Sequence, residues 1–458
     1  ELNATSKLVK AWESKNAKNA AKAGGVSLMA LSLAACGGSS TPAPDAGGDA
    51  GGDAGSPSPQ TYTLTAGIDT ITGTAAADTI NAGLNASSTQ TLQGLDTIDG
   101  GAGTDTVNVV LNTAGTYAPS MTNVEVLNLT SSAAVTVDLV GSSSVATVKS
   151  TGATGTVTLN NIASTSAVIT VQSTAVNHTI DFANSAVTGT ADSATVNVSG
   201  MTAGVLTVDA GIETLNLVSG GSANTIATLT ATGANTLNIS GGQDMTITAA
   251  NTVSETINAA TATGAITVTS NNANATTITT NSGADSVTLT GGAAVTETVS
   301  TGAGNDTVTF TASLDDVDVL NGGAGTDTLV GISADLVALT NVAGSTDNIT
   351  GFESVRVTNA LGADLTLANV QAGIESVRLD SSAAARTITF EAGAKSIDLR
   401  AATGGNLTVN DTGTATTDSL TLTNNAAATD IFNTSNLTVG GFETVSYVGS
   451  GSGAAASQ

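Results

Sequence analysis

The amino-acid sequence predicts an all-β protein built as a parallel β-solenoid, and three observations support this fold class. Apolar residues recur about every 21 positions, many of them in short segments where apolar and polar residues alternate, with glycine, asparagine and serine between the segments. Alternation indicates β-strands, because successive side chains of a strand point to opposite faces. A fixed period of about 21 residues predicts a solenoid in which each turn, or rung, stacks its inward side chains on those of the next.

Two ladders of apolar residues carry this period through the middle of the chain. The first ladder is Leu206, Ile226, Met245, Ile266, Val287, Val308 and Leu329. The second ladder is Leu215, Leu237, Ile257, Ile278, Val299 and Leu320. Because steps of this size return the chain to the same side of a solenoid, consecutive members are predicted to be neighbours in adjacent rungs.

Residues 1–37 are predicted to form a helical and apolar anchor segment. The short apolar run at 24–36 ends at Cys36 and resembles a bacterial lipoprotein signal, which implies lipidation of Cys36. The alternative is a retained helix that docks on the cell surface or on a neighbouring subunit. Cys36 is the only cysteine, so no internal disulfide can form. Residues 38–60 are rich in glycine, aspartate and proline, which predicts a flexible linker.

Residues 61–120 are predicted to form a β-roll cap with a shorter period. Four aspartates there are separated by nine, eighteen and nine residues: Asp69, Asp78, Asp96 and Asp105. Nine residues is the repeat of a calcium-binding nonapeptide. The segment GGAGTDTVN at 100–108 fits the pattern G-G-x-G-x-D-x-U-x in full.

Residues 121–331 are predicted to form the main solenoid, with a calcium edge at 283–331. Three aspartates keep the step of 21 residues, each two positions before a member of the first ladder: Asp285, Asp306 and Asp327. The segment GGAGTDTLV at 322–330 is a second full nonapeptide match. Its glycines allow a tight turn with inward carbonyls, and stacked turns of this kind form a cage of oxygen atoms that suits Ca²⁺. Ca²⁺ is therefore predicted along this edge and near Asp96 and Asp105.

The spacing is less regular in two places. It blurs between Val176 and Val198, which predicts an irregular rung or an insertion, and it loosens again across residues 332–350. Residues 332–450 are predicted to form C-terminal rungs, and residues 451–458 a mobile tail. The ladder through these rungs is Val355, Val377, Ile397, Leu420 and Val445.

A glutamate stands two positions before a ladder residue in several rungs. These residues are Glu125, Glu213, Glu353, Glu375 and Glu443. We interpret them either as solvated turn carboxylates, which we favour, or as metal ligands.

The charge balance and the scarcity of reactive side chains exclude some functions. The formal net charge is −26, from 37 acidic and 11 basic residues, which argues against nucleic-acid binding. No apolar run reaches the ~18 residues of a transmembrane helix. The single histidine, His178, lies in a strand-like segment and is interpreted as structural, and Arg356 and Arg378 as a surface stack. Acid–base catalysis on sugars needs paired carboxylates or basic residues in a cleft, so an enzyme is not expected.

These motifs resemble those of two related families. The nonapeptides resemble the RTX calcium-binding β-roll of proteins exported by type I secretion. The segments NVEVLNLTSS and GIESVRLDSS are similar to those of type I-secreted, calcium-dependent surface-layer proteins of Gram-negative bacteria. The resemblance implies calcium ligands at Asp105, Asp306 and Asp327, with backbone carbonyls around Gly101, Gly103, Gly302, Gly304, Gly323 and Gly325. Unlike an RTX roll, the 21-residue rungs are interpreted as carrying aspartate on one edge only, so ion sites are expected in two patches.

The resemblance and the repeat together predict an extracellular, calcium-stabilised structural protein that self-assembles on the bacterial cell surface, as a surface layer or filament. Its predicted partners are other copies of the chain and, through the N-terminal segment, the outer membrane or lipopolysaccharide. A calcium-dependent adhesin is the alternative, although no separate binding domain is evident. A β-helix enzyme that modifies polysaccharides is the weakest of the three hypotheses.

Overall fold

The computed structural model describes residues 57–249, 256–270, 276–290, 295–311, 314–340, 348–426, 432 and 435–449. The chain divides into two units at residues 55 and 56, and the described residues belong to the second unit. The predictions for the anchor segment, for lipidation of Cys36, for most of the linker and for the tail lie outside the described residues. Among those residues, no helix is long and apolar enough to cross a membrane.

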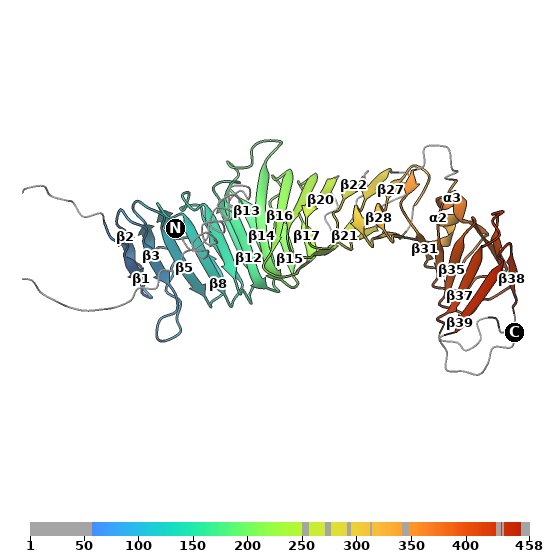
Figure 1. The fold of residues 1–458 in the computed structure, drawn as a ribbon. Coiled ribbons are helices and arrows are strands. Elements are labelled where there is room, and N and C mark those ends of the chain that lie inside the picture. Colours follow the sequence, from blue (N-terminus) through green and yellow to red (C-terminus); the bar gives the residue numbers. More distant parts are fainter. Residues whose placement is uncertain are drawn as a thin grey trace, which may run out of the picture. The chain divides into compact units, whose positions relative to one another are not determined.

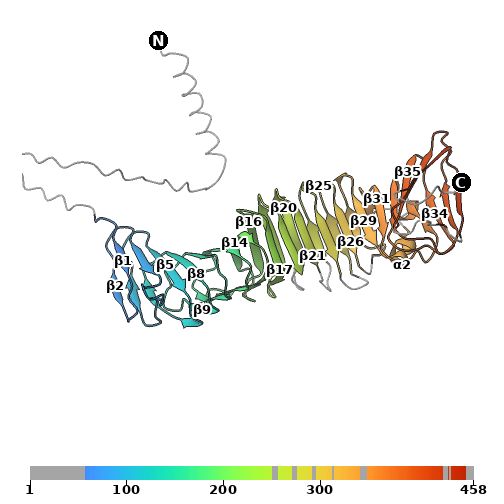
Figure 2. The ribbon, with the colours of Figure 1, turned by 90° about the horizontal axis from the view of Figure 1, so that it is seen from below.

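Two long parallel sheets run through the described part of the chain, and the rungs between residues 106 and 357 contribute one strand to each (Figures 1 and 2). Sheet 1 has 14 strands, in the spatial order β1 (Thr61–Thr63), β3 (Thr79–Ala82), β5 (Thr106–Leu111), β8 (Val126–Ser131), β10 (Thr147–Thr151), β12 (Val168–Thr174), β14 (Ser193–Met201), β16 (Thr214–Gly220), β18 (Thr236–Gly241), β20 (Thr256–Ala262), β22 (Thr276–Thr279), β24 (Glu297–Ser300), β27 (Val319–Asn321) and β30 (Ile349–Thr350).

Sheet 2 has 16 strands, in the spatial order β6 (Gly115–Tyr117), β9 (Val135–Asp138), β11 (Val157–Ile162), β13 (His178–Phe182), β15 (Val205–Val208), β17 (Asn224–Thr230), β19 (Met245–Ala249), β21 (Ile266–Ser270), β23 (Ser286–Leu289), β26 (Thr307–Phe310), β29 (Thr328–Gly331), β31 (Ser354–Val357), β33 (Ser376–Leu379), β35 (Ala394–Leu399), β37 (Ser419–Asn424) and β39 (Thr444–Gly449). The strands of each sheet follow chain order, as a solenoid requires. The predicted parallel β-solenoid is therefore confirmed.

Smaller sheets and two short helices complete the rungs. Three strands accompany the N-terminal rungs: β2 (Thr70–Thr72), β4 (Thr97–Asp99) and β7 (Ser120–Thr122). Two turn strands pair with each other: β25 (Ala303–Gly304) and β28 (Ala324–Gly325). A four-stranded sheet belongs to the C-terminal rungs: β32 (Leu365–Thr366), β34 (Arg386–Phe390), β36 (Leu407–Asp411) and β38 (Leu437–Gly440). The helices are α2 (Ser333–Ala338) and α3 (Leu367–Val370).

The second ladder has the predicted register at every step. The paired residues are Leu215, Leu237, Ile257, Ile278, Val299 and Leu320, each with the next. All six side chains are buried inside the solenoid. Leu127, Val148 and Ile169 are paired in the same way in earlier rungs of sheet 1.

The first ladder is wrong at three steps, by three residues at the first of them and by two residues at the other two. The structure pairs Leu206 with Leu229, Ile226 with Ile247, and Val268 with Val287. The steps from Met245 to Ile266 and from Val287 through Val308 to Leu329 are confirmed. A shift of two residues keeps the same face of a strand inward, so alternation alone does not determine which of two inward residues is the partner.

The N-terminal rungs follow the nine-residue period. Strands β1, β2 and β3 begin at Thr61, Thr70 and Thr79, and they alternate between sheet 1 and the three-stranded sheet. Two short strands therefore make one rung, and the aspartates before them lie alternately on its two edges.

The two irregular stretches also have structural counterparts. Val168 pairs with Thr195, a longer step than the ladder allows, so the predicted insertion lies between β13 and β14. Helix α2 occupies part of the stretch where the pattern loosens after Gly331. In the C-terminal rungs the ladder is confirmed except at one step, because Ile397 pairs with Leu422 rather than with Leu420.

Candidate metal-binding edges

The glycines of the two turns that precede β26 and β29 have backbone conformations that other residues rarely adopt. The φ angles are +92° at Gly302, +142° at Gly304, +91° at Gly323 and +152° at Gly325. A Cβ atom on Gly323 would overlap the carbonyl oxygen of Gly302, and one on Gly325 would overlap that of Gly304. Glycine is therefore required both for the turn and for the close stacking of its carbonyls on the next turn.

A carboxylate ladder runs along this edge through Asp285, Asp306, Asp327 and Glu353. The amide N–H of Asp285 donates to Oδ1 of Asp306 at 2.7 Å, and the N–H of Asp306 donates to Oδ1 of Asp327 at 2.8 Å. The N–H of Asp327 donates to Oε2 of Glu353 at 2.8 Å. Each carboxylate thus ties its rung to the preceding one, and the three aspartates are no more than 2% exposed.

The second oxygen atom divides these aspartates into two kinds. Oδ2 of Asp306 and Oδ2 of Asp327 are buried and have no hydrogen-bond partner among the described residues. Both oxygens of Asp285 accept backbone N–H groups, from Ile266 at 2.7 Å and from Asn281 at 3.1 Å. A buried carboxylate oxygen without a partner is costly, and a hard cation is a partner that satisfies it. Asp306 and Asp327 therefore fit a calcium ion better than Asp285 does.

The same division occurs in the N-terminal rungs. Oδ1 of Asp105 accepts the N–H of Asp78 at 2.6 Å, while its Oδ2 is buried without a partner among the described residues. Both oxygens of Asp96 accept backbone N–H groups, from Asp69 at 2.9 Å and from Gln93 at 2.7 Å. The turn before Asp105 contains two glycines with positive φ, Gly101 at +92° and Gly103 at +118°. Asp105 therefore resembles Asp306 and Asp327, and Asp96 resembles Asp285.

The opposite edge of the solenoid also carries carboxylates, so the interpretation of aspartate on one edge only is wrong. Glu297 and Asp318 are buried at the start of β24 and just before β27. The N–H of Glu297 donates to Oδ1 of Asp318 at 3.0 Å, and the N–H of Asp315 donates to Oδ2 at 2.9 Å. A sequence signal for this pair exists, because Asp318 stands nine residues before Asp327 and Glu297 stands 21 before Asp318.

Glu297 has an unusual pKa because of its surroundings. Burial, and then the adjacent Asp318 carboxylate, raises the pKa of Glu297 to about 8. Glu297 therefore keeps a proton at neutral pH.

Four of the glutamates singled out in the sequence have a role that neither interpretation included. Each accepts the backbone N–H of an aspartate in the preceding rung, at 2.7 to 2.8 Å. The pairs are Glu125 with Asp105, Glu213 with Asp192, Glu353 with Asp327, and Glu443 with Asp418. The remaining member, Glu375, is exposed.

Burial controls the electrostatics of the aspartates with an unpaired oxygen. It raises the pKa of Asp105, Asp306 and Asp327 above the ordinary value, and neighbouring carboxylates raise it further. Among the described residues, no three or more His, Cys, Asp or Glu side chains are placed so that they could hold a metal ion together. The donors available to a cation on these edges are one carboxylate for each rung and the carbonyls of the glycine turns.

Comparison with known proteins identifies two of the glycine turns, the one before Asp105 and the one before Asp327. Residues 63–86, 90–109 and 314–331 match the RTX calcium-binding nonapeptide repeat. The matched residues include Asp105, Asp318 and Asp327, whereas Asp285 and Asp306 lie outside them. The chain is therefore a β-solenoid that contains RTX calcium-binding repeats, and calcium is the ion that these repeats bind. No curated protein matches the chain.

Proposed function

We propose that this protein is a calcium-stabilised structural subunit that self-assembles outside the bacterial cell, as a surface layer or filament. Proteins with RTX repeats are typically secreted, and a calcium-binding β-solenoid fits an extracellular, calcium-dependent protein. The repeat occupies the described residues from the first strand to the last, which supports a structural role over one that depends on a separate binding domain.

The terminal strand β39 is the observation on which this proposal depends most. It pairs with β37 alone among the described strands, so no described strand covers its other backbone edge (Figure 1). Val445 and Tyr447 pair with Leu420 and Leu422, two fully buried residues, yet they are 49% and 48% exposed. Inward-facing apolar positions without a covering rung among the described residues, beside a strand edge that no described strand covers, favour the addition of another chain.

Calcium links folding to assembly in this proposal. At a formal charge of −26, copies of the chain repel one another, and bound cations weaken that repulsion. Calcium also satisfies buried carboxylate oxygens such as those of Asp306 and Asp327, and so stabilises the rungs. Copies of the chain are therefore expected to associate where calcium is abundant, outside the cell.

Static light scattering and electron microscopy of the full chain test self-assembly. We expect ordered particles in millimolar CaCl₂ but not in EDTA, and less association in NaCl of the same ionic strength. The double variant V445S/Y447S should remain folded and bind calcium, yet associate less, since it removes exposed apolar area and a single hydrogen bond, which Nδ2 of Asn424 donates to the Tyr447 hydroxyl. A wild-type chain that stays monomeric in calcium at high concentration would contradict the proposal and favour the calcium-dependent adhesin.

The surroundings of His178 support a non-enzymatic function. Nε2 of His178 lies 3.0 Å from Oγ of Ser150, and Nδ1 lies 3.1 Å from the carbonyl oxygen of Val176. Both side chains are 1% exposed, so no substrate in solution reaches them. Burial lowers the pKa of His178, which keeps the imidazole neutral. This pair satisfies polar groups inside the solenoid.

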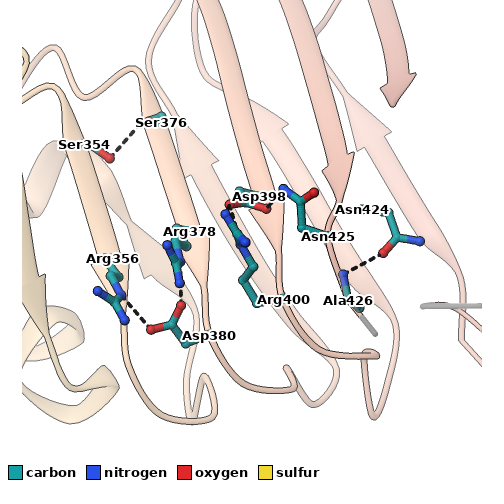
Figure 3. A network of polar contacts seen from close by, with 10 residues as sticks. All are labelled: Ser354, Arg356, Ser376, Arg378, Asp380, Asp398, Arg400, Asn424, Asn425 and Ala426. Atoms are coloured by element: carbon teal, nitrogen blue, oxygen red, sulfur yellow. Dashed lines mark hydrogen bonds and ion pairs between the residues drawn. The ribbon is translucent and has the colours of Figure 1, made fainter. Parts of the chain in front are cut away.

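The arginines and a surface pocket also support a function without catalysis. The guanidinium groups of Arg356 and Arg378 both lie 2.6 Å from the carboxylate of Asp380, which joins adjacent rungs (Figure 3). Burial acts to raise the pKa of Asp380, but hydrogen bonds from the two arginines outweigh it and lower the pKa. A pocket of about 350 Å³ beside α2 has no titratable residue in its lining.

A further inference from the structure

The turn between β36 and β37 carries two aspartates outside the matched repeats. Asp411 ends β36, and Asp418 immediately precedes β37. Gly413 N–H donates to Oδ1 of Asp411 at 2.5 Å, and Gly393 N–H donates to Oδ1 of Asp418 at 2.7 Å. Oδ2 of each residue is buried without a hydrogen-bond partner among the described residues. Each carboxylate is thus anchored through one oxygen and unsatisfied at the other.

Neighbouring rungs enclose this turn. Gly393 comes from the rung before, and Gly441 and Glu443 come from the rung after. Glu443 Oε2 accepts the N–H of Asp418 at 2.8 Å, and a Cβ on Gly441 would lie 3.0 Å from the Cβ of Asp411. Asp418 is 1% exposed as a result. Asp411 is partly exposed, but its Oδ2 atom is buried like that of Asp418, so both unpaired oxygens have little access to water.

The charge around the turn is not balanced. Asp411, Asp418 and Glu443 are acidic, and the cation that acts on Asp411 is Lys395. The ammonium group of Lys395 is itself buried and donates to the carbonyl oxygen of Ile374 at 2.9 Å. The carboxyl group of Asp418 lies close enough to Asp411 to raise its pKa, after the larger effect of burial. Two adjacent buried carboxylates are stable when they share a proton or hold a cation.

We propose that Asp411 and Asp418 bind a divalent cation of the size of Ca²⁺, at a site separate from the nonapeptide repeats. Carboxylate oxygens and turn carbonyls are the hard donors that Ca²⁺ prefers, and the unpaired Oδ2 atoms are the positions from which they would bind it. Such an ion would fasten β36 to β37 in the rung that supports the terminal strand β39. The proposal rests on the burial and hydrogen bonding of Asp411 and Asp418, and it does not require the protein to self-assemble.

Native mass spectrometry of the full chain counts the calcium ions directly. The isosteric variant D411N/D418N keeps the shape of both side chains and removes their charge, so we expect one ion fewer for each chain at saturating calcium. The variant D306N/D327N serves as a comparison, because it should lose ions from the nonapeptide edge and keep the one at Asp411 and Asp418. An unchanged count in D411N/D418N would overturn the proposal and assign a shared proton to the pair.

A second test looks for the same ion in a chain that has lost the aspartates of the repeat edges. The triple variant D105N/D306N/D327N removes the repeat aspartates that have an unpaired oxygen, and it should retain an ion that disappears when D411N/D418N is added. If adding D411N/D418N to the triple variant leaves the number of bound calcium ions unchanged, the proposed site is contradicted. Because ions are counted for each chain in dilute solution, the result is independent of whether the protein assembles.

Discussion

The aspartates that precede the strands differ in whether the second oxygen of the carboxylate has a hydrogen-bond partner. Asp285 and Asp96 use both oxygens to accept backbone N–H groups, whereas Asp105, Asp306 and Asp327 leave one buried oxygen without a partner among the described residues. Buried acceptors without partners are rare in native proteins and call for a bound group. We therefore expect calcium to stabilise the second kind of aspartate and to have little direct effect on the first.

Substituting Asp306 and Asp327 by asparagine should reduce the calcium-dependent part of the stability. A site that binds only the folded chain contributes about 2.7 kcal/mol to the free energy of unfolding at a calcium concentration 100 times its Kd. Calorimetry should show a smaller rise in Tm on calcium addition for D306N/D327N than for the wild type. The control D285N should have a lower Tm in EDTA but keep its calcium response. Equal calcium responses in both variants would contradict the distinction between the two kinds of aspartate.

Glu297 should make calcium-free stability depend on pH. Its folded-state pKa of about 8 lies above the ordinary value, so the folded chain keeps a proton that the unfolded chain has lost. This contribution is complete below the unfolded pKa and is lost as the pH rises through the folded pKa. In EDTA, the Tm of the wild type relative to E297Q should therefore fall between about pH 4.5 and 8. A difference in Tm that stays constant over this range would show that Glu297 does not hold the proton.

At the scale of the element, the glycine turn limits which amino-acid substitutions a rung tolerates. G323A places a methyl group against the carbonyl oxygen of Gly302 and requires a positive φ, so we expect a loss of roughly 1–3 kcal/mol or more in the free energy of unfolding. G83A is a matched control, because a Cβ at Gly83 meets nothing within 4 Å. Urea denaturation of both variants in EDTA measures the difference. Equal losses would mean that the stacking of the turns contributes little.

The inward face of each strand was predictable, but its exact register was not. The second ladder was correct throughout, although its strands also carry a second buried residue, such as Leu217 beside Leu215. The first ladder failed where the wrong one of two buried residues in a strand was chosen, such as Ile266 rather than Val268. Alternation fixes the face of a strand, while the partner depends on the length of the intervening turns. Helices α2 and α3 are too short to produce a helical period.

The candidate site was predictable from the sequence only in part. The nonapeptide pattern locates Asp105 and Asp327, and the step of 21 residues locates Asp306. The sequence does separate Asp285 from Asp306, because Asn281 stands where the next two turns have Gly302 and Gly323, and the N–H of Asn281 donates to the second oxygen of Asp285. The pair of Glu297 and Asp318 was missed because the two rungs use different acidic residues at equivalent positions.

At the scale of the whole molecule, stability arises from repetition. Each rung buries a few valine, isoleucine and leucine side chains against its neighbours, and the same small contact recurs along both sheets. The stability of such a stack is approximately the sum of the rungs and of the contacts between neighbours. A change in one rung, such as D306N, is therefore expected to act mainly on that rung and the two beside it.

The carboxylate ladder also gives the stack a direction. In the run from Asp285 to Glu353, every N–H donates toward the C-terminal rung and every carboxylate accepts from the N-terminal one. A partly folded stack therefore has unlike ends, with a fixed carboxylate at its N-terminal face and an unpaired N–H at its C-terminal face. A rung that joins the N-terminal face brings an N–H group to a waiting carboxylate, whereas a rung that joins the C-terminal face brings a carboxylate to a waiting N–H group, so the two ends of the stack offer opposite halves of the same hydrogen bond.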